Sequence, residues 1–236
     1  MRKLLYLFLL PLCLSHTSCT MVVKSLAKSV AKNYDNHKDM NLSNLVLKDK
    51  DGTTQTFGKL FAGKTVYMYV WKLNQLLPPA DKDSMFVALK KRFIKYNDVV
   101  FINLYNGNVA GDWQQVLDQK NKGVRSYQLA DNDVNEEFRD LMGPSTSPQI
   151  IGKDGTLLSF QGPKPTDKLV VDYVLYQART GVNGTKSAKK LISGINSNVR
   201  FKDPKLIEWY EMHFGKMPPA GKLSGSISGN NSNVGL

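Results

Sequence analysis

Thiol and imidazole groups are scarce in this chain of 236 residues, and their scarcity limits the chemistry that the chain can perform. Both cysteines, Cys13 and Cys19, lie near the N-terminus, and the three histidines are His16, His37 and His213. A cysteine-rich zinc site, a disulfide scaffold and a Cys-x-x-Cys redox pair all need more of these residues or a closer spacing. We therefore predict no metal site, no cofactor and no catalytic thiol.

Two other patterns could have carried chemistry. Glu136 and Glu137 are adjacent acids within a helical pattern, which is typical of a solvated helix face. The segment from Gly107 to Gly111 is rich in glycine, but it lacks the lysine and the following helix of a phosphate-binding loop. Neither pattern predicts a catalytic residue.

Residues 1–18 have the pattern of a secretory signal peptide. Arg2 and Lys3 provide positive charge, and the apolar run from Leu4 to Leu14 is too short to cross a hydrocarbon core of about 30 Å. A small residue directly precedes Cys19, so the segment resembles a bacterial lipoprotein signal that is cleaved before a lipidated Cys19, although His16 stands where leucine is usual. Secretion without a lipid is the alternative.

Residues 19–40 are predicted to be the lipidated cysteine followed by a basic amphipathic linker. Apolar residues recur there at helical spacing, with lysines on the other face. Such a helix can lie on an anionic membrane surface and add to a single lipid anchor. It can also pack on its own domain or act as a spacer. The lysines are Lys24, Lys28 and Lys32.

The net charge of the whole chain is +12. A basic balance is a feature of nucleic-acid-binding proteins, but an exported protein seldom meets nucleic acid, so we attribute this charge to a solvated or membrane-facing surface. The predicted location is the bacterial cell envelope, on its periplasmic or surface side. The predicted attachment to the membrane is through the N-terminal lipid.

Residues 41–180 alternate between strand-like and helix-like patterns. Asp51-Gly52 and Asp154-Gly155 each separate two short strand-like runs and predict hairpins. Apolar runs at 66–71 and 99–104 predict buried strands, and helical spacing predicts helices at 81–96, 113–122, 132–142 and from a Thr166 cap to near Gly181. This order predicts an α/β fold, a central mixed sheet with helices on both faces.

Residues 181–236 are predicted to be a C-terminal extension with one helix and a disordered tail. Asp203 is suited to the N-cap and Pro204 to the first helical position. The tail is rich in glycine, serine and asparagine. One face of the helix is apolar, through Leu206, Ile207, Tyr210 and Phe214.

Three stretches of the chain resemble one family in their order and spacing. They are Gly63-Lys64 with the following strand through Trp71 to Pro78, the segment Trp113 to Leu117, and Ser147-Pro148 with the second hairpin and Gly162 to Thr166. Together they resemble the membrane-tethered thiol-disulfide oxidoreductases of the thioredoxin superfamily, in the redoxin branch. The resemblance covers residues 41–180 and implies a thioredoxin-like fold.

The family carries a Trp-Cys-x-x-Cys motif after its first long strand, and this chain departs from it. Gln75 and Pro78 stand at the two cysteine positions. Thiol-disulfide exchange needs a thiolate that attacks and a second thiol that resolves the mixed disulfide. An amide and a pyrrolidine ring can do neither, so the resemblance implies a degenerate site without catalytic residues.

The family also carries a cis-proline opposite its active site, and Ser147-Pro148 matches that position. In relatives, the backbone before this proline pairs with an extended substrate segment, which is a form of strand addition. The resemblance therefore implies a cis Ser147–Pro148 bond in an exposed groove that Trp71, Gln75 and Pro78 also border. The alternative is that Pro148 only starts a strand and that Trp71 and Trp113 are core residues.

The favoured hypothesis is an envelope lipoprotein with a degenerate, non-catalytic thioredoxin-like domain that holds an extended peptide segment or another envelope protein. The alternative is an enzyme related to thiol-disulfide oxidoreductases that works only through cysteines of a partner. In a third hypothesis the apolar face of the 181–236 helix docks to an envelope protein.

Overall fold

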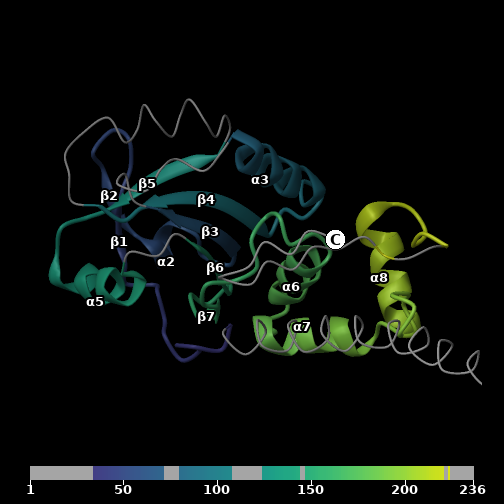
Figure 1. Cartoon of the computed structure of the whole chain (residues 1–236). Helices are drawn as coiled ribbons and strands as arrows, with labels where there is room; N and C mark the ends of the chain where they lie inside the picture. Colours follow the sequence, from purple (N-terminus) through teal and green to yellow (C-terminus); the bar gives the residue numbers. More distant parts are fainter. Residues whose placement is uncertain (1–33, 72–79, 108–123, 144–146, 221–222, 224–236) are drawn as a thin grey trace, which may run out of the picture.

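The computed structural model describes residues 34–71, 80–107, 124–143, 147–220 and 223, with the backbone alone at 80–84. At its centre is a seven-stranded mixed sheet in the order β2-β1-β5-β4-β3-β6-β7 (Figure 1). The strands are Val46–Lys48 (β1), Thr54–Thr56 (β2), Thr65–Trp71 (β3), Val99–Tyr105 (β4), Arg125–Leu129 (β5), Ser147–Ile151 (β6) and Leu157–Ser159 (β7). The helices are Phe57–Leu60 (α2), Ala80–Arg92 (α3), Asp133–Met142 (α5), Val170–Ala178 (α6), Gly184–Ser193 (α7) and Pro204–Phe214 (α8).

The middle of the sheet consists of long buried strands. β3 and β4 are parallel to each other, and β5 is parallel to β4, whereas β6 runs antiparallel to β3. All residues of β3 except Tyr69 are buried, because both faces of a central strand pack against other layers. This explains the continuous apolar run that predicted a buried strand here, and that prediction is confirmed.

Both predicted hairpins are present at the two ends of the sheet. β1 pairs antiparallel with β2 across Asp51-Gly52, and β6 pairs antiparallel with β7 across Asp154-Gly155. Gly52 and Gly155 both have a φ of 84°, a conformation that side chains with a Cβ rarely adopt. The turn chemistry therefore selects glycine at both positions.

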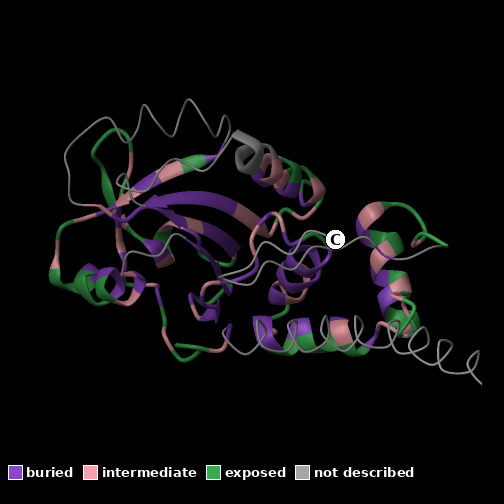
Figure 2. Cartoon of the chain, viewed as in Figure 1, coloured by how far each residue is buried: buried purple, intermediate pink, exposed green. Residues whose placement is uncertain are grey.

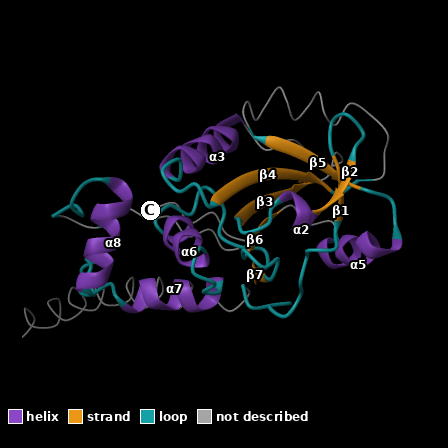
Figure 3. Ribbon diagram, turned by 180° about the vertical axis from the view of Figure 1, so that it is seen from behind, coloured by secondary structure: helices purple, strands orange, loops and turns teal. Residues whose placement is uncertain are grey.

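Helices cover both faces of the sheet, as the sequence pattern predicted (Figure 3). On one face α3 and α6 contribute Phe86, Leu89, Val171 and Val174 to a core that Tyr67 of β3 shares. The other face is covered by α2 and α5, and its core is a separate cluster, which includes Phe57, Phe138, Val66, Met68 and Ile102.

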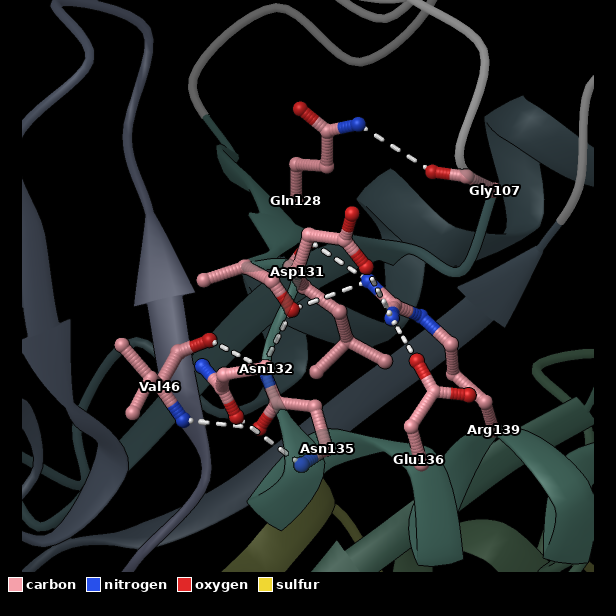
Figure 4. A network of polar contacts seen from close by, with 10 residues as sticks. Val46, Gly107, Gln128, Asp131, Asn132, Asn135, Glu136 and Arg139 are labelled. Carbon is pink, nitrogen blue, oxygen red and sulfur yellow. Dashed lines mark hydrogen bonds and ion pairs between the residues drawn. The ribbon is translucent and has the colours of Figure 1, made fainter.

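α5 is fixed to the sheet by polar contacts as well as by packing (Figure 4). The side chain of Asn135 accepts from the backbone N–H of Val46 at 2.9 Å and donates to the carbonyls of Val46 and Ala130, each at 2.8 Å. The Asn132 side chain caps the helix by accepting from Asn135 N at 3.0 Å. Arg139 donates to Glu136 at 2.6 Å and to Asp131 at 3.2 Å. Because Asn135 satisfies both backbone groups of Val46, it joins α5 to β1.

The N-terminal part of the described chain runs along the outer edge of β7. Leu42 N donates to Gly155 O, Leu157 N to Met40 O and Phe160 N to Tyr34 O, at 2.8, 2.8 and 3.2 Å. Tyr34 is also part of the core cluster on the α3 and α6 face. The end of the 19–40 segment is therefore anchored to the domain, whereas residues 1–33 lie outside the described residues.

The C-terminal extension differs from its prediction. It contains two helices within the described residues, α7 and α8, where one was predicted. α7 packs on α6 and β7 with its small residues, since Gly184, Thr185, Ser187 and Ala188 are all buried. A helix with so few large apolar residues gives a weak periodic signal, which is why the pattern did not predict it.

Two further details correct the predicted elements. β5 was not predicted, because Arg125–Leu129 is short and mostly polar; it gains its place by pairing with β4 and β1. α6 begins at Val170 rather than at a Thr166 cap, because residues 164–167 form a turn in which Lys164 N donates to the Asp167 carboxylate at 2.8 Å. The helix predicted at 113–122 lies outside the described residues.

The contact between α7 and β7 provides a test of the packing. A Cβ placed on Gly184 would lie 1.8 Å from Ser159 Oγ and 3.3 Å from Tyr34 Cβ. We expect Gly184→Ala to lower the free energy of unfolding by about 1–3 kcal/mol, because the clash outweighs the better helix propensity of alanine. Urea denaturation measures this change.

Ser159→Ala in the same background is the matched control. The Ser159 hydroxyl is buried without a hydrogen-bond partner in the described part of the chain, so removing it costs little by itself. The double variant should recover most of the lost stability. A Gly184→Ala protein as stable as the wild type would contradict the described contact.

Candidate functional site

The predicted groove lies at the edge of the sheet where β3 ends and β6 begins. Trp71 is the last residue of β3, and Ser147, the first residue of β6, is in register with Val70. The structure therefore brings Trp71 and Ser147-Pro148 to one edge. Gln75, Pro78, Trp113 and Cys19 lie outside the described residues, so their predicted roles stay predictions.

The prediction of a cis bond before Pro148 is wrong. The described residues contain no cis peptide bond, so Ser147–Pro148 is trans. Pro148 lies inside a continuous antiparallel ladder, opposite Tyr69, and the ladder begins one residue earlier at Ser147. An extended backbone before proline fits such a ladder in the trans form.

The prediction of an exposed groove at this position is also wrong. Ser147 is only 5% exposed, and Pro148 is buried. The chain itself covers the outer side of β6, because Gly162 N donates to Pro148 O at 2.8 Å and Gln161 N donates to Gln149 Oε1 at 3.0 Å. The Gln149 amide in turn donates to Ser147 Oγ at 3.0 Å. An incoming peptide strand would have to displace residues 161–162.

Trp71 is a core residue rather than a groove wall. It is 5% exposed, and its ring lies edge-on to Tyr105 with 5.8 Å between centroids. The backbone holds it from the next strand, since Asn106 N donates to Trp71 O at 2.9 Å. Several buried polar atoms near this edge lack a partner in the described part of the chain: Trp71 Nε1, Asn103 Nδ2, Ser126 Oγ and both amide atoms of Asn106. These groups can donate or accept hydrogen bonds. The Ser126 hydroxyl has no base hydrogen-bonded to it in the described part of the chain, as a serine nucleophile needs, and none of the other groups is an acid or a base suited to catalysis.

A second polar constellation, which the sequence analysis did not predict, lies between α3, α6 and α8. The Asp172 carboxylate on α6 accepts from Arg92 Nε at 2.6 Å and from a second nitrogen of the same guanidinium at 2.9 Å. It also lies 3.0 Å from His213 Nε2 on α8. The side chains of Asp172 and His213 are 1% and 0% exposed.

The hydrogen-bond partners decide which nitrogen of His213 carries a proton. A carboxylate only accepts, so Nε2 donates to Asp172. In the neutral ring Nδ1 then accepts from the Tyr96 hydroxyl at 3.2 Å. Burial raises the pKa of Tyr96 to about 12, so this hydroxyl keeps the proton that it donates.

The charge of Asp172 is stabilised despite its burial. Desolvation alone would raise the pKa of this carboxyl, but the hydrogen bonds from His213 and Arg92 outweigh desolvation and hold the pKa below its ordinary value. Asp172 is therefore ionised at neutral pH, and its charge is compensated by Arg92.

Aromatic rings enclose His213 and complete the contact between α8 and the domain. The ring is stacked with Tyr96 and with Trp209, at 5.7 Å in both cases, and Phe93 lies 4.8 Å away. Lys95 donates to the carbonyls of Met212 and His213 at the end of α8. These contacts fix α8 to the end of α3. His213 therefore positions α8, and because its side chain is fully buried it is not accessible to a substrate.

The apolar face predicted for α8 is shifted by the structure. Leu206, Trp209 and His213 are buried, at positions i, i+3 and i+7 of the helix, whereas Ile207 is half-buried. Tyr210 and Phe214 pack beside the core cluster from its edge. Leu206 packs fully into the protein's own domain and Tyr210 and Phe214 pack in part, so docking of this face to another envelope protein stays a prediction.

Metal-binding clusters and membrane-spanning helices are both absent from the described residues. The described residues contain no group of three or more histidine, cysteine or acidic residues placed to hold a metal ion. None of the helices in the described ranges has the length and apolar character needed to cross a bilayer.

Comparison with known proteins finds similarity in structure only. No family model and no curated protein matches the chain. A candidate thiol-disulfide oxidoreductase from Bacteroides vulgatus is 21% identical with a TM-score of 0.44, and the match covers 55% of this chain and 90% of that chain. A candidate thiol:disulfide interchange protein DsbE from Chlorobium tepidum is 16% identical with a TM-score of 0.44, over 59% and 95% of the two chains. A secreted disulfide oxidoreductase from Mycobacterium tuberculosis is 16% identical with a TM-score of 0.37, over 51% and 84%.

Strand order and direction in the sheet decide the fold. β3 and β4 form a parallel pair joined through α3, β6 and β7 form an antiparallel hairpin next to β3, and α6 follows. The domain has the thioredoxin-like fold. It extends the fold with the β1–β2 hairpin and with α7 and α8, and its sheet contains no thiol, since both cysteines of the chain precede residue 20.

The ionised carboxyl of Asp172 predicts how the stability of the thioredoxin-like domain depends on pH. A group whose pKa is lower in the folded than in the unfolded state stabilises the fold at pH values above the unfolded pKa, and this contribution is lost as the pH falls through the folded pKa. At pH 7 we expect Asp172→Asn to lower the free energy of unfolding by about 2–4 kcal/mol, because it removes the charge that Arg92 needs.

Urea denaturation of both proteins between pH 7 and pH 2 is the measurement. The difference between the wild type and Asp172→Asn should be constant from neutral pH to about 4, the ordinary pKa of this side chain, and shrink below it. Asp98→Asn is a matched control at the more exposed ion pairs with Lys153 and Arg179, and it should cost less. A difference that does not change with pH would show that Asp172 stabilises the fold without its charge.

Proposed function

We propose that this chain is a non-catalytic scaffold module, an exported envelope lipoprotein whose thioredoxin-like domain has lost thiol chemistry and presents a rigid surface to other components of the envelope. The observation that carries the proposal is the absence of any cysteine from residues 20–236 of a chain with a fold of thiol-disulfide oxidoreductases. A redox step on this domain has no sulfur atom to attack or to resolve a disulfide.

The closed edge at β6 supports a scaffold rather than a peptide-binding role at the old active-site position. Residues 161–162 already satisfy the backbone carbonyl of Pro148 and the side chain of Gln149. Ser147 is buried as well. A partner of this domain would therefore bind another surface than the one that relatives of this fold use for substrates.

The C-terminal helices support the same proposal. α7 and α8 extend the core of the domain, and α8 is held by buried charge and ring contacts at the end of α3. The helix that follows the degenerate site in sequence is thus fixed at its far end. A domain stiffened in this way is suited to holding a fixed surface.

The signal-like N-terminus supports the envelope location. Residues 1–18 have the charge and apolar pattern of a secretory signal, and the small residue before Cys19 favours lipidation at that cysteine. The lipid would insert into the membrane, and the segment that is anchored to the domain from Tyr34 would connect the lipidated cysteine to the domain.

The first test concerns chemistry. We expect the purified protein to give no dithiol-dependent reduction of insulin above a reaction without protein, because the folded domain has no thiolate. Precipitation of the insulin B chain followed by turbidity is the measurement. Any rate above background would overturn the proposal that the domain has lost thiol chemistry.

Introducing cysteines at these two positions shows whether the assay can detect thiol-disulfide exchange by this domain. The variant with Gln75→Cys and Pro78→Cys places a Cys-x-x-Cys pair in the segment directly before α3, where a helix N-terminus lowers the pKa of a thiol. Gain of measurable exchange in this variant, with none in the wild type, would attribute the inactivity to the two replaced positions.

The second test concerns location. We expect Cys19→Ser to move the protein from the membrane fraction to the soluble fraction of the envelope, because a lipidated cysteine is the proposed anchor. Immunoblots of the two fractions measure the shift, and mass spectrometry of the N-terminus reports the lipid. A wild-type protein that carries no lipid at residue 19 would overturn the lipoprotein proposal and leave plain secretion.

A further inference from the structure

Three of the four exposed residues of α7 are lysines, and the fourth is Ser193 at its end. Its buried residues pack on α6 and β7, and the outward positions between them are Lys186, Lys189 and Lys190. The spacing of i, i+3 and i+4 places these three lysines on one side of the helix. Figure 2 shows the alternation of buried and exposed residues along α7.

Few acidic residues lie near this charge: Asp35 follows Tyr34, which contacts the start of α7, and it forms no ion pair with a lysine of α7. The stretch 181–202 contains five basic and no acidic residues. Among the described residues, no ion pair involves a lysine of α7. The elements under the helix, α6 and β7, contain Asp172 as their one acid, and Asp172 is buried and bound to Arg92 and His213. The next acid along the chain, Asp203, is engaged in capping α8.

The loop after α7 enlarges the basic surface. The chain turns tightly at 196–200, where Asn196 N donates to Arg200 O at 2.8 Å, and it returns to the end of α7, where Lys202 N donates to Gly194 O at 2.8 Å. Arg200 and Lys202 are both exposed. The basic face of α7, defined as Lys186, Lys189, Lys190, Arg200 and Lys202, is thus held by a folded loop and a packed helix.

The start of α7 lies beside Tyr34, the first described residue at the N-terminal end of the chain. A Cβ on Gly184, at the start of α7, would lie 3.3 Å from Tyr34 Cβ. Cys19 precedes Tyr34 by only fifteen residues, a length that reaches about 50 Å when fully extended. A chain anchored at Cys19 therefore holds the start of α7 within about 50 Å of the membrane surface.

We propose that the basic face of α7 binds the headgroups of anionic phospholipids and orients the domain on the membrane, an inference that rests on the proposed anchor at Cys19. Clusters of lysine and arginine next to a membrane attachment are attracted by a negative bilayer surface. A basic surface adds electrostatic attraction to a lipid anchor and favours one orientation of the domain on the bilayer.

The test separates this surface from the lipid anchor. The exported chain from residue 19, carrying Cys19→Ser, is mixed with vesicles of phosphatidylglycerol and phosphatidylcholine, and bound protein is measured by sedimentation. Each lysine at an anionic surface contributes about fivefold to binding. Changing Lys186, Lys189 and Lys190 together to glutamine should therefore weaken binding about 100-fold.

The matched control removes the same charge elsewhere. Lys48, Lys59 and Lys91 are exposed residues of β1, α2 and α3, away from α7, and their change to glutamine should weaken binding far less. Binding should also be lost on vesicles of phosphatidylcholine alone, and when salt rises from about 0.1 M to about 1 M, since the screening length falls from about 10 Å to about 3 Å.

Several outcomes would overturn the proposal. Equal losses in the two triple variants would mean that only net charge matters, and no loss in either would remove α7 from the membrane contact. Full competition by polyglutamate at charge concentrations far below those of the lipid would assign the basic face of α7 to an acidic protein instead. Because Cys19→Ser is present throughout, none of these outcomes depends on whether the native chain is lipidated.

Discussion

The carboxylate of Asp172 is buried on α6 and accepts hydrogen bonds from two elements at once, Arg92 of α3 and His213 of α8. An ion buried this deeply is tolerated only when its partners are in place, so each of the three helices depends on the other two. The aromatic rings around His213 add packing to this constraint, and Lys95 adds contacts to the end of α8. The extension beyond residue 180 is consequently a part of the folded unit rather than an attachment to it. Removing α8 would leave Asp172 with a single partner and expose the face of α3 that carries Phe93.

The two ends of α3 have different surroundings in this molecule. Gln75 and Pro78, the positions predicted to match a cysteine pair, precede α3 in the sequence, and at the sheet edge Gly162 N donates to Pro148 O and Gln161 N to Gln149 Oε1. At its end, the helix is fixed by α8. The edge at β6 is thus occupied by internal hydrogen bonds, and the residues beyond 180 pack on the domain.

The parts of the fold that local chemistry determines could be predicted from the sequence. Gly52 and Gly155 occupy turn positions that glycine alone adopts easily, and the buried strands around Tyr67 and Ile102 have unbroken apolar runs, so the hairpins and the central sheet followed from short segments. The candidate site depended on contacts that no local pattern encodes. Asp172 and His213 are 41 residues apart in sequence, and Ser147 is buried by a segment that follows the next hairpin. The geometry at Pro148 was inferred from a family pattern, and the regular ladder with β3 made the trans bond the better fit.

The segment at 34–42, which consists of turns and a single bridge at Asn41, has a consequence for how copies of this protein can meet. It occupies the outer edge of β7 through the backbone bonds of Tyr34, Met40 and Leu42, so that edge has no free row of donors and acceptors. The sheet therefore ends in a described strand at its other side alone, at β2, a strand of three polar residues. Open edges are where sheets of separate molecules join and aggregate. The edge that the described sheet offers to other copies of the chain is short and polar, so it is poorly suited to continuing the sheet.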